Sequence, residues 1–138
     1  MLKVCLEMNS RMVVWSPVES LEDASRKVRE EIERNDIGSR AWTGGDVVDD
    51  DGNYVAWVSY NGRIWDPKSK HGREAFERYL SRLDKSQLID MSMAQDDRYT
   101  KLRGYHSGLT RGRCGIFSES ELRKLIVESE LHLRRRNA

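Results

Sequence analysis

Residues 98–117 hold the side chains best suited to binding another molecule. The segment contains five cations and no acidic residue, with aromatic side chains interleaved among them. Lysine and arginine contact phosphates while aromatic rings stack on bases, and arginine also anchors acidic protein surfaces. The competing interpretation is a solvated loop, in which isolated charges contribute little. We predict a binding surface that includes Arg98, Lys101, Arg103, Tyr105, Arg111 and Arg113.

A second aromatic group occurs in VAWVSYNGRIWD, residues 55–66. Trp57 and Trp65 are residues of the kind that stack on bases or anchor partner proteins. They are also residues that strands favour, which makes them equally suited to the core of a small sheet. The core interpretation is preferred for Trp65. Trp57 lies on a more mixed face, across from Asp66, and joins the predicted binding residues.

Catalysis has weaker support in the sequence. The nucleophile would be Cys114 with His71 or His106 as its base, or one of the serines, and arginines on either side of Cys114 would lower its thiol pKa. No nucleophile elbow, HExxH, Walker loop or GxGxxG pattern is present. We therefore predict no catalytic residue, and an enzyme built around Cys114 or His106 is kept only as an alternative.

A metal or cofactor is not expected either. Asp49, Asp50 and Asp51 stand beside Gly52, but the twelve-residue EF-hand pattern with its final glutamate is absent. A solvated hairpin tip explains these acids better. We predict no metal and no cofactor.

Composition favours a small cytoplasmic protein. The chain has 138 residues, enough for one domain, and its two cysteines form no CxxC pair. No apolar run approaches the roughly 18–20 residues of a membrane span, and the start of the sequence does not resemble a signal peptide. Residues 1–66 carry eight cations against thirteen acids, whereas residues 67–138 carry sixteen against ten. This polarity suggests a charged partner or a self-complementary homodimer.

The acidic half should combine strands with one helix. Residues 2–9 alternate as a strand does, residues 12–15 extend it or pair with it, and Pro17 should stop regular pairing. Ser20 is placed to cap a helix of about sixteen residues, and Gly38 is placed to end it. The apolar stripe of this helix is formed by Leu21, Ala24, Val28 and Ile32.

The strands that follow should form a three-stranded meander. Residues 45–48 lead into a turn and then into YVAWVSY, and Asn61-Gly62 is typical of a type I′ hairpin. That turn would pair Val58 with Trp65. It would place Tyr54, Val58 and Trp65 on one face. Both faces are partly apolar, so we expect something to cover each side.

The basic half should be mostly helical. Residues 73–84 show a helical apolar stripe, residues 86–105 fit a short helix or a packed loop, and residues 103–116 contain four glycines and should be irregular. Ser118 and Glu121 form a capping box for a last helix. One face of that helix should carry Leu122, Leu125, Ile126, Ser129 and Leu133. The predicted fold is α+β: an antiparallel sheet of about four strands with a packed helix, then a mostly helical half. We treat residues 1–138 as one domain with parts 1–66 and 67–138.

Residues 20–66 resemble a helix-plus-hairpin module of uncharacterised plasmid and phage proteins. The similarity rests on the S-x-x-x-A helix start, the W-x-G-G-x-V entry and the S-Y-N-G-R-x-W hairpin. The resemblance brings no activity and no site residues, but it implies an accessory protein of a mobile element. We expect a non-enzymatic module that binds a host protein or nucleoprotein, for instance to inhibit host defence. Direct nucleic-acid binding through residues 98–117 and the last helix is the alternative.

Overall fold

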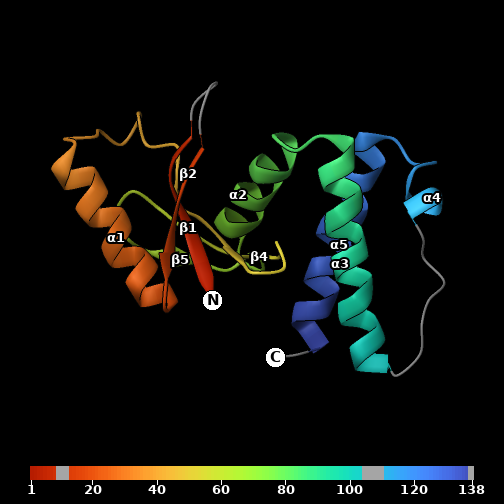
Figure 1. The fold of residues 1–138 in the computed structure, drawn as a ribbon. Coiled ribbons are helices and arrows are strands. Elements are labelled where there is room, and N and C mark those ends of the chain that lie inside the picture. The colour runs from red at the N-terminus through yellow and green to blue at the C-terminus, as the bar shows by residue number, and fades with distance from the viewer. Residues whose placement is uncertain (9–12, 104–110, 137–138) are drawn as a thin grey trace. The chain divides into compact units, whose positions relative to one another are not determined.

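The computed structural model describes residues 1–8, 13–103 and 111–136 (Figure 1). Their strands are β1 (Leu2–Met8), β2 (Val13–Val18), β3 (Asp46–Asp49), β4 (Tyr54–Val58) and β5 (Ile64–Trp65). Their helices are α1 (Leu21–Arg34), α2 (Lys70–Ser81), α3 (Lys85–Arg103), α4 (Arg111–Cys114) and α5 (Glu119–Arg136). The strands form one antiparallel sheet in the order β2-β1-β3-β4-β5. The predicted α+β class is confirmed, with five strands where about four were expected.

The chain divides into two compact units, Met1–Phe76 and Glu77–Ala138. The boundary falls inside α2, beyond the change from acidic to basic composition at Asp66. The first unit contains the sheet, α1 and the start of α2. The second contains the remaining helices. That the whole chain is one domain stays a prediction.

The edge strand β2 passes through Pro17, contrary to the prediction that pairing stops there. Pro17 lies opposite Lys3 of β1, and its carbonyl accepts a hydrogen bond of 2.7 Å from the Lys27 ammonium of α1. An edge strand tolerates proline because one side of the strand has no partner strand to receive an N–H. The outer side of β2 is therefore partly covered by a lysine.

Helix α1 begins as predicted and ends earlier. The hydroxyl of Ser20 accepts a hydrogen bond of 3.0 Å from the amide of Asp23, and Ala24, Val28 and Ile32 are buried against the sheet. The helix has 14 residues and ends at Arg34, with Asp36 taking a left-handed φ of 50°. Gly38 is therefore not its cap.

The hairpin at residues 59–63 uses a different turn from the one predicted. The amide of Gly62 donates to the carbonyl of Ser59, and the amide of Ser59 donates to the carbonyl of Arg63. Gly62 has a φ of 84° but Asn61 does not have a positive φ, so the turn is not type I′. The loop has three central residues, and pairing shifts by one: Val58 lies opposite Ile64 instead of Trp65.

A bulge between β3 and β4 redistributes the aromatic side chains over the two faces. Val47 pairs with Ala56 and Val48 with Tyr54, leaving Val55 as the extra residue. The Tyr54 ring stacks on Phe76 of α2 at 4.7 Å between centroids, whereas Val58 belongs to the core under α1. The prediction of a common face for Tyr54 and Val58 is therefore wrong. Within the first unit each face does have a helical cover (Figure 1).

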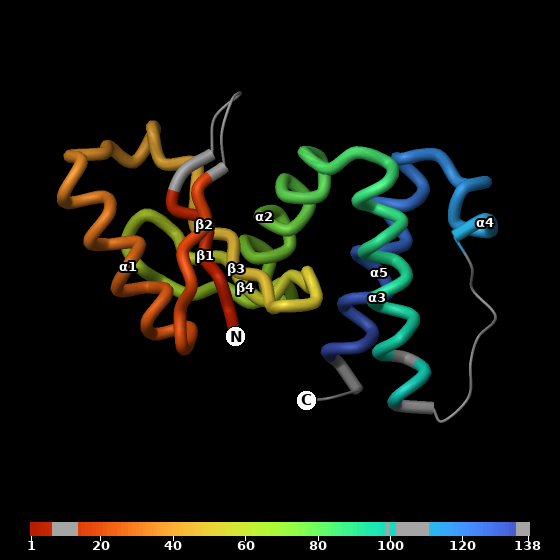
Figure 2. Tube along the Cα trace, in the orientation of Figure 1, coloured from red at the N-terminus to blue at the C-terminus, as the bar shows by residue number. Residues whose placement is uncertain are grey.

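The second unit is built on two long parallel helices, α3 and α5 (Figure 2). The side chain of Gln95 donates to the carbonyl of Ile126 at 2.9 Å, and one turn further Arg98 meets Glu130. Helix α5 starts at the predicted capping box: Ser118 and Glu121 exchange two hydrogen bonds, each of 3.1 Å. Residues 86–103, part of the segment 86–105 predicted to be a short helix or a packed loop, form most of the 19-residue α3. Residues 111–114, predicted to be irregular, form the short helix α4.

Candidate binding site

Arg98, a predicted binding residue, is used inside the second unit. Its guanidinium contacts both carboxylate oxygens of Glu130, at 2.6 and 3.2 Å. The Glu130 side chain is 3% exposed and also accepts a hydrogen bond of 2.9 Å from Arg134. A buried carboxylate needs such partners. The charge of Arg98 is therefore largely committed to the fold.

The other predicted residues of this segment lie along two separate helices. Lys101 is exposed near the end of α3, and Arg103 is the last residue of that helix. Arg111 and Arg113 are exposed on α4, where Arg111 forms an ion pair with Asp90 of α3. Tyr105 lies outside the described residues. The segment is thus partly helical, and two of its described cations, Arg98 and Arg111, form ion pairs with acidic residues.

Cys114 does not have the properties of a nucleophile. It is 2% exposed, and burial raises the pKa of its thiol more than the nearby charge of Arg111 lowers it. Arg111 thus has the predicted lowering effect on this pKa, but burial outweighs it and the net shift is upward. Of the two proposed bases, His106 lies outside the described residues, and His71 lies on α2 beside Glu74, 3.9 Å away, and the ring of Trp65.

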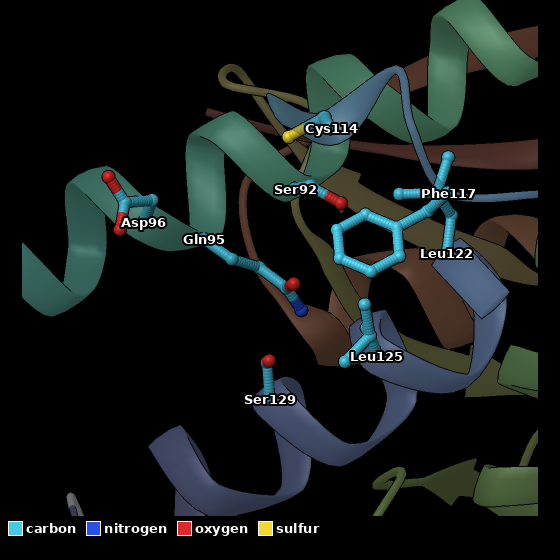
Figure 3. A pocket seen from close by; sticks show the side chains of 8 residues that line it. All are labelled: Ser92, Gln95, Asp96, Cys114, Phe117, Leu122, Leu125 and Ser129. Atoms are coloured by element: carbon cyan, nitrogen blue, oxygen red, sulfur yellow. The ribbon is translucent and has the colours of Figure 1, made fainter. Parts of the chain in front are cut away.

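An open pocket of about 140 Å³ lies between α3 and α5 (Figure 3). Its apolar lining consists of Cys114 of α4, Phe117, and Leu122 and Leu125 of α5. Its polar lining consists of Ser92, Gln95 and Asp96 of α3 and Ser129 of α5. The pocket therefore has an apolar wall, which suits an apolar group, and a polar border.

Exposed apolar side chains adjoin this pocket. In the described part of the chain the exposed large hydrophobic residues are Met1, Ile116 at 79% and Leu125 at 42%. Leu125 lines the pocket, and Ile116 directly precedes the pocket residue Phe117. The face predicted from the sequence is thus only partly buried: Leu125 is exposed, whereas the buried residues of α5 are Leu122, Ile126, Val127, Glu130 and Leu133.

Sequence reasoning missed this pocket although it named several of its residues. The charged Glu130 occupies a buried place on α5, whereas the apolar Leu125 is exposed. The sequence offered two signals of an exposed apolar site. One is the apolar Leu125 next to the buried face of α5, and the other is the apolar Ile116 beside a glycine.

The tryptophans of the first unit are engaged in its sheet. The indole N–H of Trp57 donates to the carbonyl of Gly44 at 3.2 Å, and its side chain is only partly exposed. Arg63 lies over the ring of Trp65 at 4.3 Å, and His71 approaches the same ring edge-on at 4.9 Å. Trp57 lies directly opposite Trp65 of β5, not opposite Asp66 as predicted.

The acidic turn is organised by its own hydrogen bonds. The carboxylate of Asp49 accepts from the amides of Asp51 and Asn53, at 2.9 Å each. Among the described residues no group of three or more His, Cys, Asp or Glu side chains is arranged to hold a metal ion. Nor is any helix in this part of the chain long and apolar enough to cross a membrane.

Comparisons of the chain with protein-family models, with curated proteins and with solved structures found no match.

Proposed function

We propose that the protein is a non-catalytic binding module that recognises a protein through the helices of its second unit. The observation that carries this proposal is the open apolar pocket with the exposed Leu125 in its wall, together with the exposed Ile116, which directly precedes the lining residue Phe117. Exposed apolar residues next to a concave apolar surface are typical of protein-interaction sites. The partner is a host protein, or the protein part of a host nucleoprotein complex.

The state of Cys114 supports binding over catalysis. A nucleophilic cysteine needs an accessible thiol with a lowered pKa, and Cys114 has neither. The proposal that the protein serves a mobile genetic element in the host cytoplasm, as an inhibitor of host defence, rests on the resemblance of residues 20–66 to plasmid and phage modules.

Direct nucleic-acid binding is the second candidate, favoured by the charge of the second unit. Residues 77–138 carry thirteen cations against nine acids. Phosphate contacts require cations that are free to leave their present partners. Because Arg98 is held by the buried Glu130, the second unit has fewer cations available for phosphate contacts than its sequence suggests.

Photo-crosslinking in host cells tests the proposed function. A benzophenone amino acid replaces Ile116, and a matched variant carries it at Lys124, which is exposed on α5 but does not line the pocket. We expect one host protein to be crosslinked from position 116 and not from 124. The purified partner should then bind the unmodified protein in solution. Equal crosslinking from both positions, or crosslinking to nucleic acid alone, contradicts the proposal.

A further inference from the structure

We propose that the pocket between α3 and α5 receives one large apolar side chain, leucine or phenylalanine, from an acidic segment of the partner protein. This inference rests on the proposed function and specifies what the site recognises. It follows from the size of the pocket, the chemistry of its walls and the charge of α4.

The size of the pocket limits its occupant to one side chain. Its volume is about 140 Å³, close to the roughly 150 Å³ of an apolar cavity that accommodates a benzene ring. Pockets for cofactors and drug-sized molecules are larger, about 300–1,000 Å³. A single aromatic ring or a leucine side chain fits this space.

The walls of the pocket favour an apolar occupant. Phe117, Leu122 and Leu125 offer only carbon atoms to it (Figure 3). On the polar border, the amide nitrogen of Gln95 already donates to the carbonyl of Ile126 and to Glu130. A polar ligand would lose hydrogen bonds to water at the apolar walls, whereas an apolar side chain would lose none.

The charge of α4 favours acidic residues beside that side chain. Arg111 and Arg113 are exposed and flank Cys114, whose side chain lines the pocket. The ion pair of Arg111 with Asp90 joins two exposed side chains. Such a pair contributes little, so Arg111 can exchange Asp90 for a carboxylate of the partner.

The position of Asp96 orients the segment. Its carboxylate lies at the border of the pocket, away from Phe117 and Leu125 (Figure 3). A second carboxylate placed there would be repelled. The acidic residues of the partner therefore lie away from Asp96, and its apolar side chain contacts Phe117 and Leu125.

Selection from a phage-displayed library of random dodecapeptides tests this inference. The full-length protein is the target, and peptides that also bind the Ser92→Leu variant are removed. Leucine at position 92 fills the pocket and favours the helix. We expect the remaining peptides to share one leucine or aromatic position next to aspartate or glutamate.

The selected peptide is then measured by fluorescence anisotropy against single variants. Leu125→Ala should weaken binding on the order of tenfold, the effect of truncating a contact at the centre of an interface. Arg111→Glu combined with Arg113→Glu should weaken it at least as much, because like charges then face each other. The control Lys124→Ala, also on α5, should leave the affinity unchanged, and circular dichroism should show all variants folded.

Two outcomes would overturn the inference. One is the absence of any peptide whose binding depends on Ser92 and Leu125, and the other is a consensus that is basic or lacks an apolar position. The proposed function is tested separately, by crosslinking from position 116. It fails if positions 116 and 124 crosslink equally or if only nucleic acid is crosslinked. A crosslinked partner whose affinity is unaffected by Ser92→Leu would retain the function and refute the occupant assigned to the pocket.

Discussion

The guanidinium of Arg98 holds the carboxylate of Glu130, which is among the largest fully buried side chains of the described residues. The two residues lie on α3 and α5, which are joined by a long connection and run parallel. Because the amide of Gln95 also reaches Glu130, at 3.3 Å, three polar side chains meet between the helices. A cation that sequence alone assigns to a binding surface thus contributes to folding.

Replacing Glu130 with alanine should destabilise the protein strongly. The change leaves Arg98 and Arg134 without their shared carboxylate in a largely buried position. Removing one partner of a buried ion pair costs about 3–5 kcal/mol, and the partial exposure of Arg98 points to the lower end. Urea unfolding followed by circular dichroism measures the free energy of unfolding.

Glu128→Ala is the matched control, since Glu128 is exposed on the same helix. It should change the free energy of unfolding by no more than about 0.5 kcal/mol. Similar losses in the two variants would show that Glu130 is not specifically held by the arginines.

Gly45→Ala should also destabilise the protein. Gly45 has a φ of 103°, and a Cβ there would lie 2.0 Å from the carbonyl oxygen of Val58. A non-glycine residue in this conformation costs about 1–3 kcal/mol before any clash is counted. Gly38→Ala, where a Cβ meets nothing within 4 Å, should have little effect. Thermal unfolding compares the two, and equal melting temperatures would contradict the close approach of Gly45 to β4.

Local features were predicted from the sequence because a few neighbouring residues determine them. The caps at Ser20 and Ser118 depend only on residues within one helical turn, and both form. The role of Gly45 was missed because it depends on distant residues. Its amide donates to the carbonyl of Cys5, and its carbonyl accepts from the amide of Val58. Two strands far apart in the sequence create that constraint.

The turn type of the hairpin and the existence of the pocket also could not be predicted from neighbouring residues alone. Asn61-Gly62 indicated a turn at the right place, but the turn type depends on whether Asn61 takes a positive φ, which the pair of residues alone does not fix. The pocket combines α3, α4 and α5 residues from a parallel arrangement that periodicity does not reveal. On α5 the charged Glu130 is buried and paired with Arg98 of α3, while the apolar Leu125 is exposed, which is the reverse of what polarity predicts.

Acid should weaken the cap of α5 through Glu121. The amide of Ser118 donates to this carboxylate and lowers its pKa below the ordinary 4.5, with a further contribution from the Ser118 hydroxyl. A lowered folded-state pKa means that the contribution to stability is present above the unfolded value and is lost as the pH falls through the folded value. We expect NMR titration to give Glu121 a pKa below that of an unperturbed glutamate.

Ser118→Ala tests the origin of that shift. It removes the hydroxyl but retains the backbone amide, so the pKa of Glu121 should rise without reaching its ordinary value. The variant should also lose roughly 0.5–2 kcal/mol of stability through the missing cap. Ser120→Ala should reduce the stability less than Ser118→Ala does. Equal losses of stability in the two variants would mean that the helix starts elsewhere.

The thiol of Cys114 should react slowly in the folded protein. It is buried, and burial raises its pKa, so little thiolate is present near neutral pH. Ellman's reagent should modify Cys114 in a Cys5→Ser variant much faster in urea than in buffer. Rapid modification in buffer would revive the catalytic alternative.

The choice between a protein partner and a nucleic-acid partner can be tested by reversing the charges of Arg103, Arg111 and Arg113 to glutamate. We expect the parent protein to bind duplex and single-stranded DNA no more tightly than the roughly 10⁻⁴–10⁻⁶ M of non-specific binding at physiological salt. The crosslinked protein partner, in contrast, should bind the triple variant on the order of tenfold or more weakly, since reversed charges meet its acidic surface.

Affinity measured over a range of salt concentrations separates the alternatives further. A nucleic-acid binder that contacts phosphates through these arginines loses affinity for every sequence and shows a shallower salt slope in the variant. A protein binder loses its partner in the variant, and its DNA binding, already weak and non-specific in the parent, only becomes weaker. Tight parent binding to DNA with a steep salt slope that the triple variant flattens would decide for the nucleic-acid alternative. Unchanged affinity for both ligands would mean that the cations of α4 are only a solvated surface, as isolated exposed charges usually are.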